Sequence, residues 1–168
     1  MVAGKHEMSL ITVQDVWQIL QEIKDPEIPV VSLVEMGLIR DVRVNGGAVE
    51  VVLTPTFVGC PALQVMQEEV QTRLEEAGAT QVRVTTSHHP PWSSDWITPA
   101  GRKRLKEFGL APPPRHAGSP DLMLPELAAC PYCGSEDTSL KNSFGPTACR
   151  MIFYCNACQQ PFEQFKPV

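Results

Sequence analysis

The sequence predicts a small α+β domain followed by a separate, β-rich module that folds around a metal ion. Helical and strand-like patterns alternate through the first 110 residues, and a stretch with five prolines covers residues 111–129. Two Cys-x-x-Cys pairs follow. We therefore expect a domain over residues 1–110, a linker over 111–129 and a four-cysteine metal-binding module over 130–168.

The first expected helix covers about residues 13–24. Thr12 and Asp15 have the spacing of a capping box, with Asp in place of the usual Glu. Apolar residues then recur at helical spacing: Val13, Val16, Trp17, Leu20 and Ile23. Asp25-Pro26 ends the helix, because the residue before proline is disfavoured in the helical region.

Two strands are expected over residues 38–44 and 48–54, which are rich in β-branched side chains. Asn45-Gly46-Gly47 lies between them and supplies the positive φ angles of a tight hairpin. In the first strand the apolar residues alternate to one face, with Arg40 as the exception.

A second helix is expected to begin at Pro61, since proline suits the first helical position, and to stop at Gly78. A short strand around residues 82–84 and a last helix from Thr98-Pro99 to Phe108 follow. The order helix, strand, strand, helix, strand, helix predicts helices packed on one face of a three-stranded sheet.

The two Cys-x-x-Cys pairs give the strongest chemical signal. Cys130 and Cys133 form the first pair and Cys155 and Cys158 the second, with 21 residues between the pairs. Four thiolates arranged in this way are typical of a closed tetrahedral zinc site, and so small a module needs a metal for stability. Iron is the alternative, because the segment from Cys130 matches the Cys-Pro-x-Cys-Gly pattern of rubredoxins. After the second pair, Gln159 stands where that pattern has glycine.

Cys149 is a fifth cysteine close to this module. It could replace one of the four ligands, bind a second metal, or pack as a small apolar side chain.

Cys60 directly precedes the helix that is expected to begin at Pro61. Unpaired N–H groups and the helix dipole would lower the pKa of a thiol there, so that Cys60 could hold iron or pass on a cluster. Asp25, Glu27 and Glu35 could add oxygen ligands, although such residues more often cap turns. The alternative is a buried, structural cysteine.

A loop with His88, His89, Trp92 and Trp96 could form a binding surface, but amphipathic rings more often cover the edge of a core. We find no constellation for acid–base chemistry, hydride transfer or oxygen activation, which favours a non-catalytic role.

The charge pattern argues against nucleic acid as a partner. The formal net charge is −5, and the segment from Cys130 carries equal numbers of acidic and basic residues. No apolar run suggests a signal peptide or a membrane span, so we expect a cytoplasmic protein that does not bind membranes. In the cytoplasm, paired cysteines bind metal more often than they form disulfides.

Several segments resemble the MIP18-like family, also called the domain of unknown function 59, whose members are linked to iron–sulfur protein maturation. They are residues 25–29 (DPEIP), 35–39 (EMGLI), the hairpin and Gly59-Cys60-Pro61. Residues 91–98, 108–113, 144–149 and 161–166 narrow the resemblance to the PaaD (PaaJ) family of components of bacterial phenylacetyl-CoA epoxidase systems. The chain departs from that pattern at Pro146, where serine is expected.

The resemblance implies an accessory role in phenylacetate degradation. The oxygenase subunit of such systems uses a di-iron site, and the reductase carries an iron–sulfur centre and flavin. A PaaD-like protein would help to mature one of these partners. Cys60, with Glu27 or Asp25, would meet iron or a cluster in transit.

Two alternatives stay open. The chain could be a structural or regulatory subunit, or an electron carrier with iron in the four-cysteine site. A homo-oligomer is also compatible with the sequence.

Overall fold

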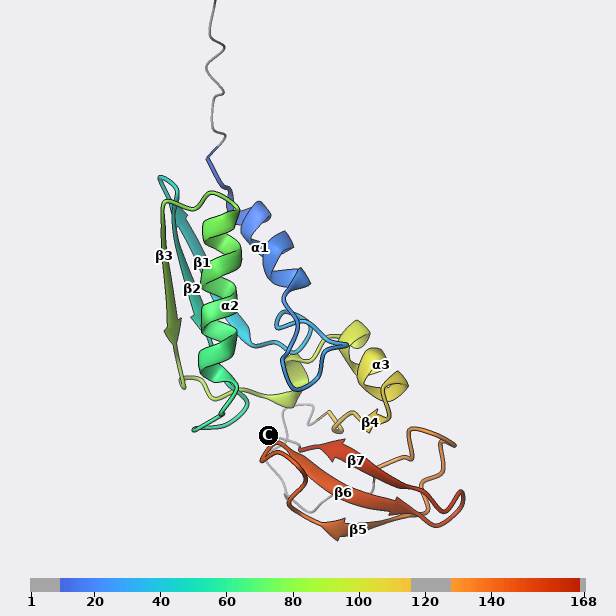
Figure 1. The fold of residues 1–168 in the computed structure, drawn as a ribbon. Coiled ribbons are helices and arrows are strands. Elements are labelled where there is room, and N and C mark those ends of the chain that lie inside the picture. Colours follow the sequence, from blue (N-terminus) through green and yellow to red (C-terminus); the bar gives the residue numbers. More distant parts are fainter. Residues whose placement is uncertain (1–9, 116–127, 167–168) are drawn as a thin grey trace, which may run out of the picture.

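The computed structural model describes residues 10–115 and 128–166, and these form an α/β part and a small β-sheet part (Figure 1). The first part contains α1 (Val13–Glu22), β1 (Ile39–Asn45), β2 (Ala48–Leu53), α2 (Leu63–Glu76) and β3 (Gln81–Thr86). A short 3₁₀ helix (Ser94–Trp96) and α3 (Pro99–Glu107) follow. The predicted α+β class and element order are confirmed.

The capping box at the start of α1 is present. The Thr12 hydroxyl accepts a hydrogen bond from Asp15 N at 3.2 Å, and Thr12 N donates to the Asp15 carboxylate at 2.9 Å. The helix ends at Glu22, two residues earlier than predicted, because Ile23 is already extended and Lys24 bridges to Ser32.

The first sheet has the order β1-β2-β3. β1 and β2 pair antiparallel through the predicted hairpin, whereas β2 and β3 are parallel and α2 makes the crossover that parallel strands require. The register shifts between Ile39 and Asp41, and this bulge explains the exceptional Arg40. Its guanidinium lies 3.7 Å from the ring centroid of Trp96.

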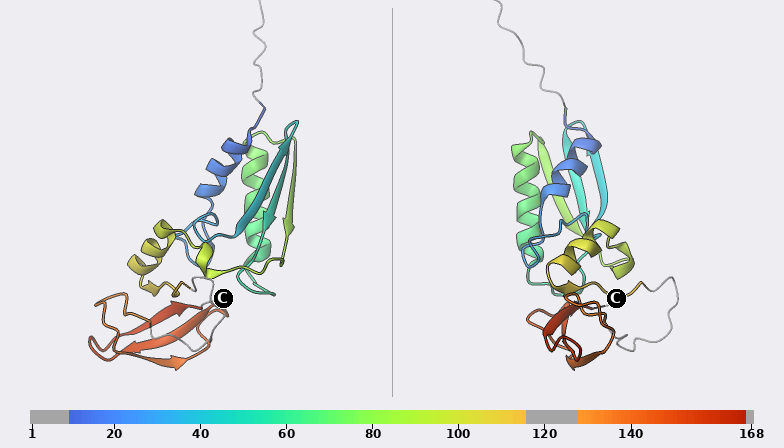
Figure 2. Two further views of the ribbon diagram at one scale, coloured as in Figure 1. Left: turned by 180° about the vertical axis from the view of Figure 1, so that it is seen from behind. Right: turned by 90° about the vertical axis from the view of Figure 1, so that its right-hand side faces the viewer.

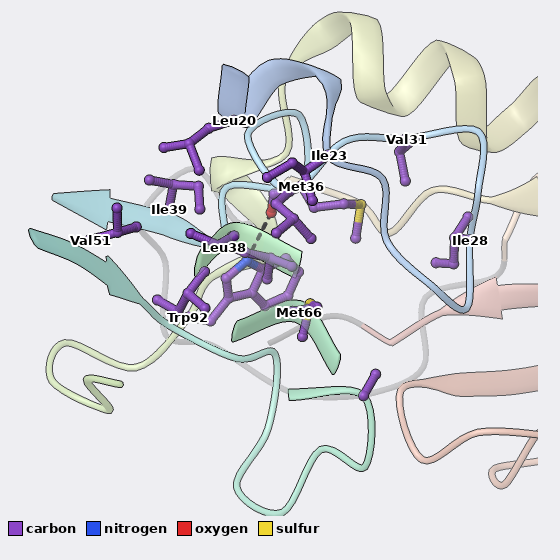
Figure 3. Packing of buried hydrophobic residues seen from close by; sticks show 14 of the residues in the cluster. Leu20, Ile23, Ile28, Val31, Met36, Leu38, Ile39, Val51, Met66 and Trp92 are labelled. Carbon is purple, nitrogen blue, oxygen red and sulfur yellow. Dashed lines mark hydrogen bonds between the residues drawn. The ribbon is translucent and has the colours of Figure 1, made fainter. Parts of the chain in front are cut away.

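Helices α1 and α2 cover one face of this sheet (Figures 1 and 2). The core beneath them continues into the loops around Trp92, which is 2% exposed. Figure 3 shows the indole nitrogen of Trp92 directed at the Met36 carbonyl, to which it donates at 2.9 Å. One interpretation of the loop placed Trp92 in a binding surface. Trp92 is instead a core residue.

The second sheet is formed by β4 (Leu110–Ala111), β5 (Thr138–Asn142), β6 (Arg150–Cys155) and β7 (Pro161–Phe165), in the order β4-β7-β6-β5. Ala111, predicted as the first linker residue, thus pairs in a sheet. Most of the linker, residues 116–127, lies outside the described residues. None of the described helices is both long enough and apolar enough to cross a bilayer.

Contacts of Phe165 and Arg150 are among those that tie the second sheet to the first part. The rings of Phe165 and Trp92 pack with centroids 5.6 Å apart, so that Phe165 belongs to the core of the first part. Arg150 donates to the backbone carbonyl of Glu27 at 2.8 Å. The second sheet therefore lies against the loops at one end of the first, as both views in Figure 2 show.

Candidate metal centre

The two Cys-x-x-Cys segments form matching turns. Gly134 N donates to the Cys130 carbonyl and Gln159 N to the Cys155 carbonyl, both at 2.9 Å. The ligand atoms of Cys130, Cys133, Cys155 and Cys158 all lie within 4.8 Å of one another. The fold thus brings together two turns that are separated by strands β5 and β6.

The sulfur positions fit one metal ion. Cys130 Sγ lies 3.7 Å from Cys158 Sγ, and Cys133 Sγ lies 3.5 Å from Cys155 Sγ. A tetrahedron with metal–sulfur bonds of about 2.3 Å has edges of about 3.8 Å, whereas a disulfide bond is about 2.05 Å long. The four cysteines are therefore placed so that they could hold one metal ion.

Hydrogen bonds prepare one of the four sulfurs, that of Cys155, for metal binding. The N–H of Cys158 donates to Cys155 Sγ at 3.5 Å. This hydrogen bond, together with weaker ones from the Cys158 and Cys133 side chains and the Ala157 N–H, lowers the pKa of the Cys155 thiol to about 7. Because a metal binds the thiolate, the lowered pKa favours Cys155 as the ligand that loses its proton first.

Gln159 occupies the place where the rubredoxin pattern has glycine. Its φ angle is 60°, close to the 79° of Gly134 in the first turn. The second turn therefore has the same left-handed backbone as the first, although a non-glycine residue there costs about 1–2 kcal/mol.

We expect Gln159→Gly to raise the free energy of unfolding by about 1 kcal/mol or less, since the flexibility of glycine in the unfolded chain offsets part of the gain. Urea unfolding of the metal-loaded protein measures the change. Gln160→Gly is the control and should destabilise by about 0.5–1 kcal/mol. A loss of stability in both variants would show that the left-handed turn is not strained.

Cys60 does not lie where the sequence placed it. Helix α2 begins at Leu63 with Ala62 as its N-cap, so Cys60 precedes the helix by three residues and Pro61 lies in a turn. Leu63 N donates to the Cys60 carbonyl at 3.2 Å. The prediction that the helix begins at Pro61 is wrong, because a tight turn comes first.

The prediction of a lowered pKa for Cys60 is also wrong. Burial raises the pKa of the Cys60 thiol, and Glu27, Asp25 and Cys149 raise it further. A hydrogen bond from the Ala62 N–H opposes them without cancelling the rise. Without a cation, Cys60 is thus a protonated thiol among acidic neighbours.

Asp25 and Glu27 lie beside Cys60 along the edge of a small cavity, which Cys149 also lines. Asp25 Oδ1 accepts hydrogen bonds from Glu27 N at 2.8 Å and Ile28 N at 3.0 Å. Asp25 therefore holds the turn that presents Glu27. Burial raises the pKa of Asp25 in spite of these hydrogen bonds.

We expect Asp25→Asn to raise the free energy of unfolding at neutral pH. With a raised pKa, the stabilising contribution of Asp25 is complete below its ordinary pKa of 3.8 and is lost as the pH rises through the folded value. Asparagine keeps an acceptor for both N–H groups and removes the buried charge.

Urea unfolding at neutral and at mildly acidic pH, with metal content checked, measures this effect. The difference from the wild type should shrink toward acidic pH. Asp41→Asn is the control, since its half-exposed carboxylate pairs with Arg43 at 2.7 Å and such pairs contribute little. A destabilised Asp25→Asn variant at neutral pH would contradict the expectation.

Cys149 lies beside Cys60 and is not one of the four clustered ligands. Its sulfur contacts the Thr147 hydroxyl at 3.1 Å, and its carbonyl accepts from Lys166 N at 2.8 Å. Sequence reasoning treated Cys149 as a neighbour of the module and Cys60 as a separate site. Tertiary contacts such as those of Arg150 with Glu27 and of Phe165 with Trp92 bring the two together.

Glu35, a further candidate oxygen ligand, has a structural role. Its carboxylate accepts from Ser32 N at 2.9 Å and pairs with Arg104 at 3.0 Å, and the side chain is 7% exposed. Both oxygens are therefore engaged away from Cys60.

Comparison with known proteins shows two matches to family models. A model described as iron–sulfur cluster assembly protein matches residues 13–86. A model described as PaaD zinc beta ribbon domain matches residues 119–166. The chain is also 38% identical over 154 residues to an Escherichia coli protein named as the D component of 1,2-phenylacetyl-CoA epoxidase, covering 92% of each chain.

The chain belongs to the PaaD family of phenylacetyl-CoA epoxidase components. Its first part has other relatives, among them an Fe–S protein maturation auxiliary factor of Porphyromonas gingivalis. That protein is 34% identical over 91 residues, which cover 53% of this chain and 86% of the relative.

A solved structure has the same fold as the first part of this PaaD family member. It is a conserved hypothetical protein of Thermotoga maritima, with 26% identity and a TM-score of 0.51. The match covers 61% of this chain and 99% of that chain. The first part of this chain thus corresponds to nearly the whole of that protein.

Proposed function

We propose that the chain is an accessory subunit of a phenylacetyl-CoA epoxidase that helps to load iron or an iron–sulfur cluster into the oxygenase or the reductase. Two kinds of relative support this role: the E. coli epoxidase component and the Fe–S protein maturation factors. In this role the chain handles metal for another subunit and does not catalyse epoxidation.

The observation that carries the proposal is the group formed by Cys60, Asp25 and Glu27 around one cavity. All three side chains are half-buried, so they are shielded from bulk water and still reachable by a partner. A thiol and two carboxyl groups suit an iron ion, because they combine a soft ligand with hard ones.

We further propose that the four-cysteine site holds zinc and is structural. Cys130 and Cys155 are fully buried, and four protein ligands leave no open position for a reaction. Elemental analysis and a visible spectrum test this assignment, since a zinc–thiolate site is colourless. Stoichiometric iron with visible absorption would instead favour the electron-carrier alternative.

The loading role is tested by expressing the oxygenase and reductase subunits with and without this chain. We expect both to be produced, but one to contain less iron and to have less activity when the chain is absent. Metal content of the purified subunits, measured before any enzyme assay, separates loading from a direct effect on turnover. Full iron content in both subunits without the chain would reject the proposal.

A structural subunit is the second candidate, favoured by the name of the E. coli relative as a component of the epoxidase. The two roles differ in the lifetime of the complex. A stable stoichiometric complex whose iron content does not depend on the chain would favour the structural role, whereas a transient contact with iron-dependent maturation favours loading.

A further inference from the structure

We propose that Cys60 and Cys149 are the two thiol ligands of a second metal site, which takes a single divalent, thiol-binding cation such as Fe²⁺. This inference rests on the proposed loading function and extends it, because it makes the C-terminal ribbon part of the loading site. One carboxyl group, from Asp25 or Glu27, would complete the ligand set.

Hydrogen bonds of Arg150 and Lys166 hold Cys149 in position. Arg150 donates to the Glu27 carbonyl at 2.8 Å and pairs with Glu163 at 3.0 Å. Lys166 N donates to the Cys149 carbonyl at 2.8 Å. These contacts join the start of β6 and the end of β7 to the turn that carries Asp25 and Glu27. Cys149 consequently lines the same cavity as Cys60, although 88 residues separate them in the sequence.

The donor set matches a divalent cation. Two thiols and two carboxyl groups line the cavity, and the guanidinium of Arg150 lies close enough to interact electrostatically with Cys149. When M²⁺ binds, both S–H bonds break, two protons leave to water and two metal–sulfur bonds form. The two thiolates then balance the charge of the ion, while a carboxylate supplies the oxygen ligand that Fe²⁺ accepts beside sulfur.

The cavity favours one ion over a cluster. Its volume is about 10 Å³, close to the smallest space that holds a water molecule. An iron–sulfur cluster is larger and would have to stand outside it.

The second site is also less closed than the first. Within residues 10–115 and 128–166, one group of three or more potential metal ligands has all its ligand atoms within 4.8 Å of one another, and it is the group of Cys130, Cys133, Cys155 and Cys158. Ligands of the second site must therefore shift to close around an ion. Weak binding of this kind suits a cation that is passed to a partner.

The test uses the full chain with its four-cysteine site loaded with zinc, kept reduced and free of oxygen. Co²⁺ is added as the probe, because it binds like Fe²⁺ and its thiolate charge-transfer absorption reports the number of bound sulfurs. We expect one equivalent of Co²⁺ to bind with two thiolates while the zinc content stays constant. The absence of this sulfur-bound equivalent of Co²⁺ would overturn the inference.

Cys149→Ser and Cys60→Ser should each remove about half of the charge-transfer absorption. Each should also weaken Co²⁺ binding by more than tenfold, because even the loss of a residue that only hydrogen-bonds to a metal ligand weakens binding by about tenfold or more. Ala148→Ser is the matched control, since it adds a hydroxyl next to Cys149 on an exposed residue, and it should bind like the wild type. Unchanged absorption and affinity in Cys149→Ser would overturn the inference.

Alkylation of the unmodified chain gives a second readout that does not depend on the folding of a variant. Bound Co²⁺ should protect Cys60 and Cys149 together from iodoacetamide, as measured by mass spectrometry of the peptides. Protection of Cys60 without Cys149 would contradict a shared site.

The outcome separates this inference from the proposed function. If Cys60→Ser abolishes client loading while Cys149→Ser changes neither loading nor Co²⁺ binding, the function stands and the shared site falls. If Co²⁺ binding needs both thiols while client loading needs neither, the site stands and the loading function falls.

Discussion

Cys130→Ser is expected to abolish metal binding at the four-cysteine site and to unfold the C-terminal ribbon. The apolar cluster of the ribbon is small and includes two of the ligands, Cys130 and Cys155, so little else stabilises it. In such modules the free energy of metal binding, about 10–16 kcal/mol for zinc-finger peptides, is largely the free energy of folding. Elemental analysis and limited proteolysis of the purified variant measure both effects.

We expect the α/β part to keep its own unfolding transition in Cys130→Ser, in line with the proposed division of the chain. That transition should occur at lower temperature, because Phe165 would leave Trp92 and the loss of a buried phenylalanine costs about 3–5 kcal/mol. Cys149→Ser is the matched control and should retain one zinc ion per chain. Loss of all helical circular dichroism in Cys130→Ser would show that the two parts fold as one unit.

Cys60→Ser is expected to reduce the iron content of the client protein to the level found without this chain, while the variant itself stays folded. Serine is slightly smaller than cysteine, and its hydroxyl can still accept the hydrogen bond from the Ala62 N–H. A hydroxyl is a poor ligand for Fe²⁺ at neutral pH, so the site loses the Cys60 thiolate and little else. Coexpression with the oxygenase and reductase, followed by iron analysis of each, measures the loss.

Thr56→Ser is the matched control for Cys60→Ser, since Thr56 lines the same cavity and carries no thiol. It should leave client loading unchanged, and both variants should have thermal transitions close to that of the wild type. Normal loading of every client by folded Cys60→Ser would exclude a role for this thiol and leave the structural alternative.

Most of the fold could be predicted from local patterns in the sequence. The Thr12–Asp15 capping box and the glycine hairpin act within a few residues, so their structure follows from the residues present. The α2 start was misplaced because proline is acceptable both at the first helical position and in the turn that precedes a helix. The bulge that redirects Arg40 depends on the pairing of β1 with β2. In the sequence it is visible only as a break in the alternation of apolar and polar residues.

The two metal sites differ in the same way. The four-cysteine site could be predicted because each half is a short turn with a fixed spacing, and metal chemistry then joins the halves. The environment of Cys60 could not, because its raised pKa depends on burial and on Asp25, Glu27 and Cys149. These three neighbours lie on segments whose proximity to Cys60 no spacing rule describes.

By itself, then, the sequence determined the order of helices and strands, the turns between them and the two Cys-x-x-Cys turns of the candidate metal site. These features depend on residues only a few positions apart. The tertiary structure alone decided that Cys149 meets Cys60. That meeting depends on Phe165 packing against Trp92 and on Arg150 reaching the Glu27 carbonyl. Such contacts arise from the shapes of two folded parts, which no local pattern encodes.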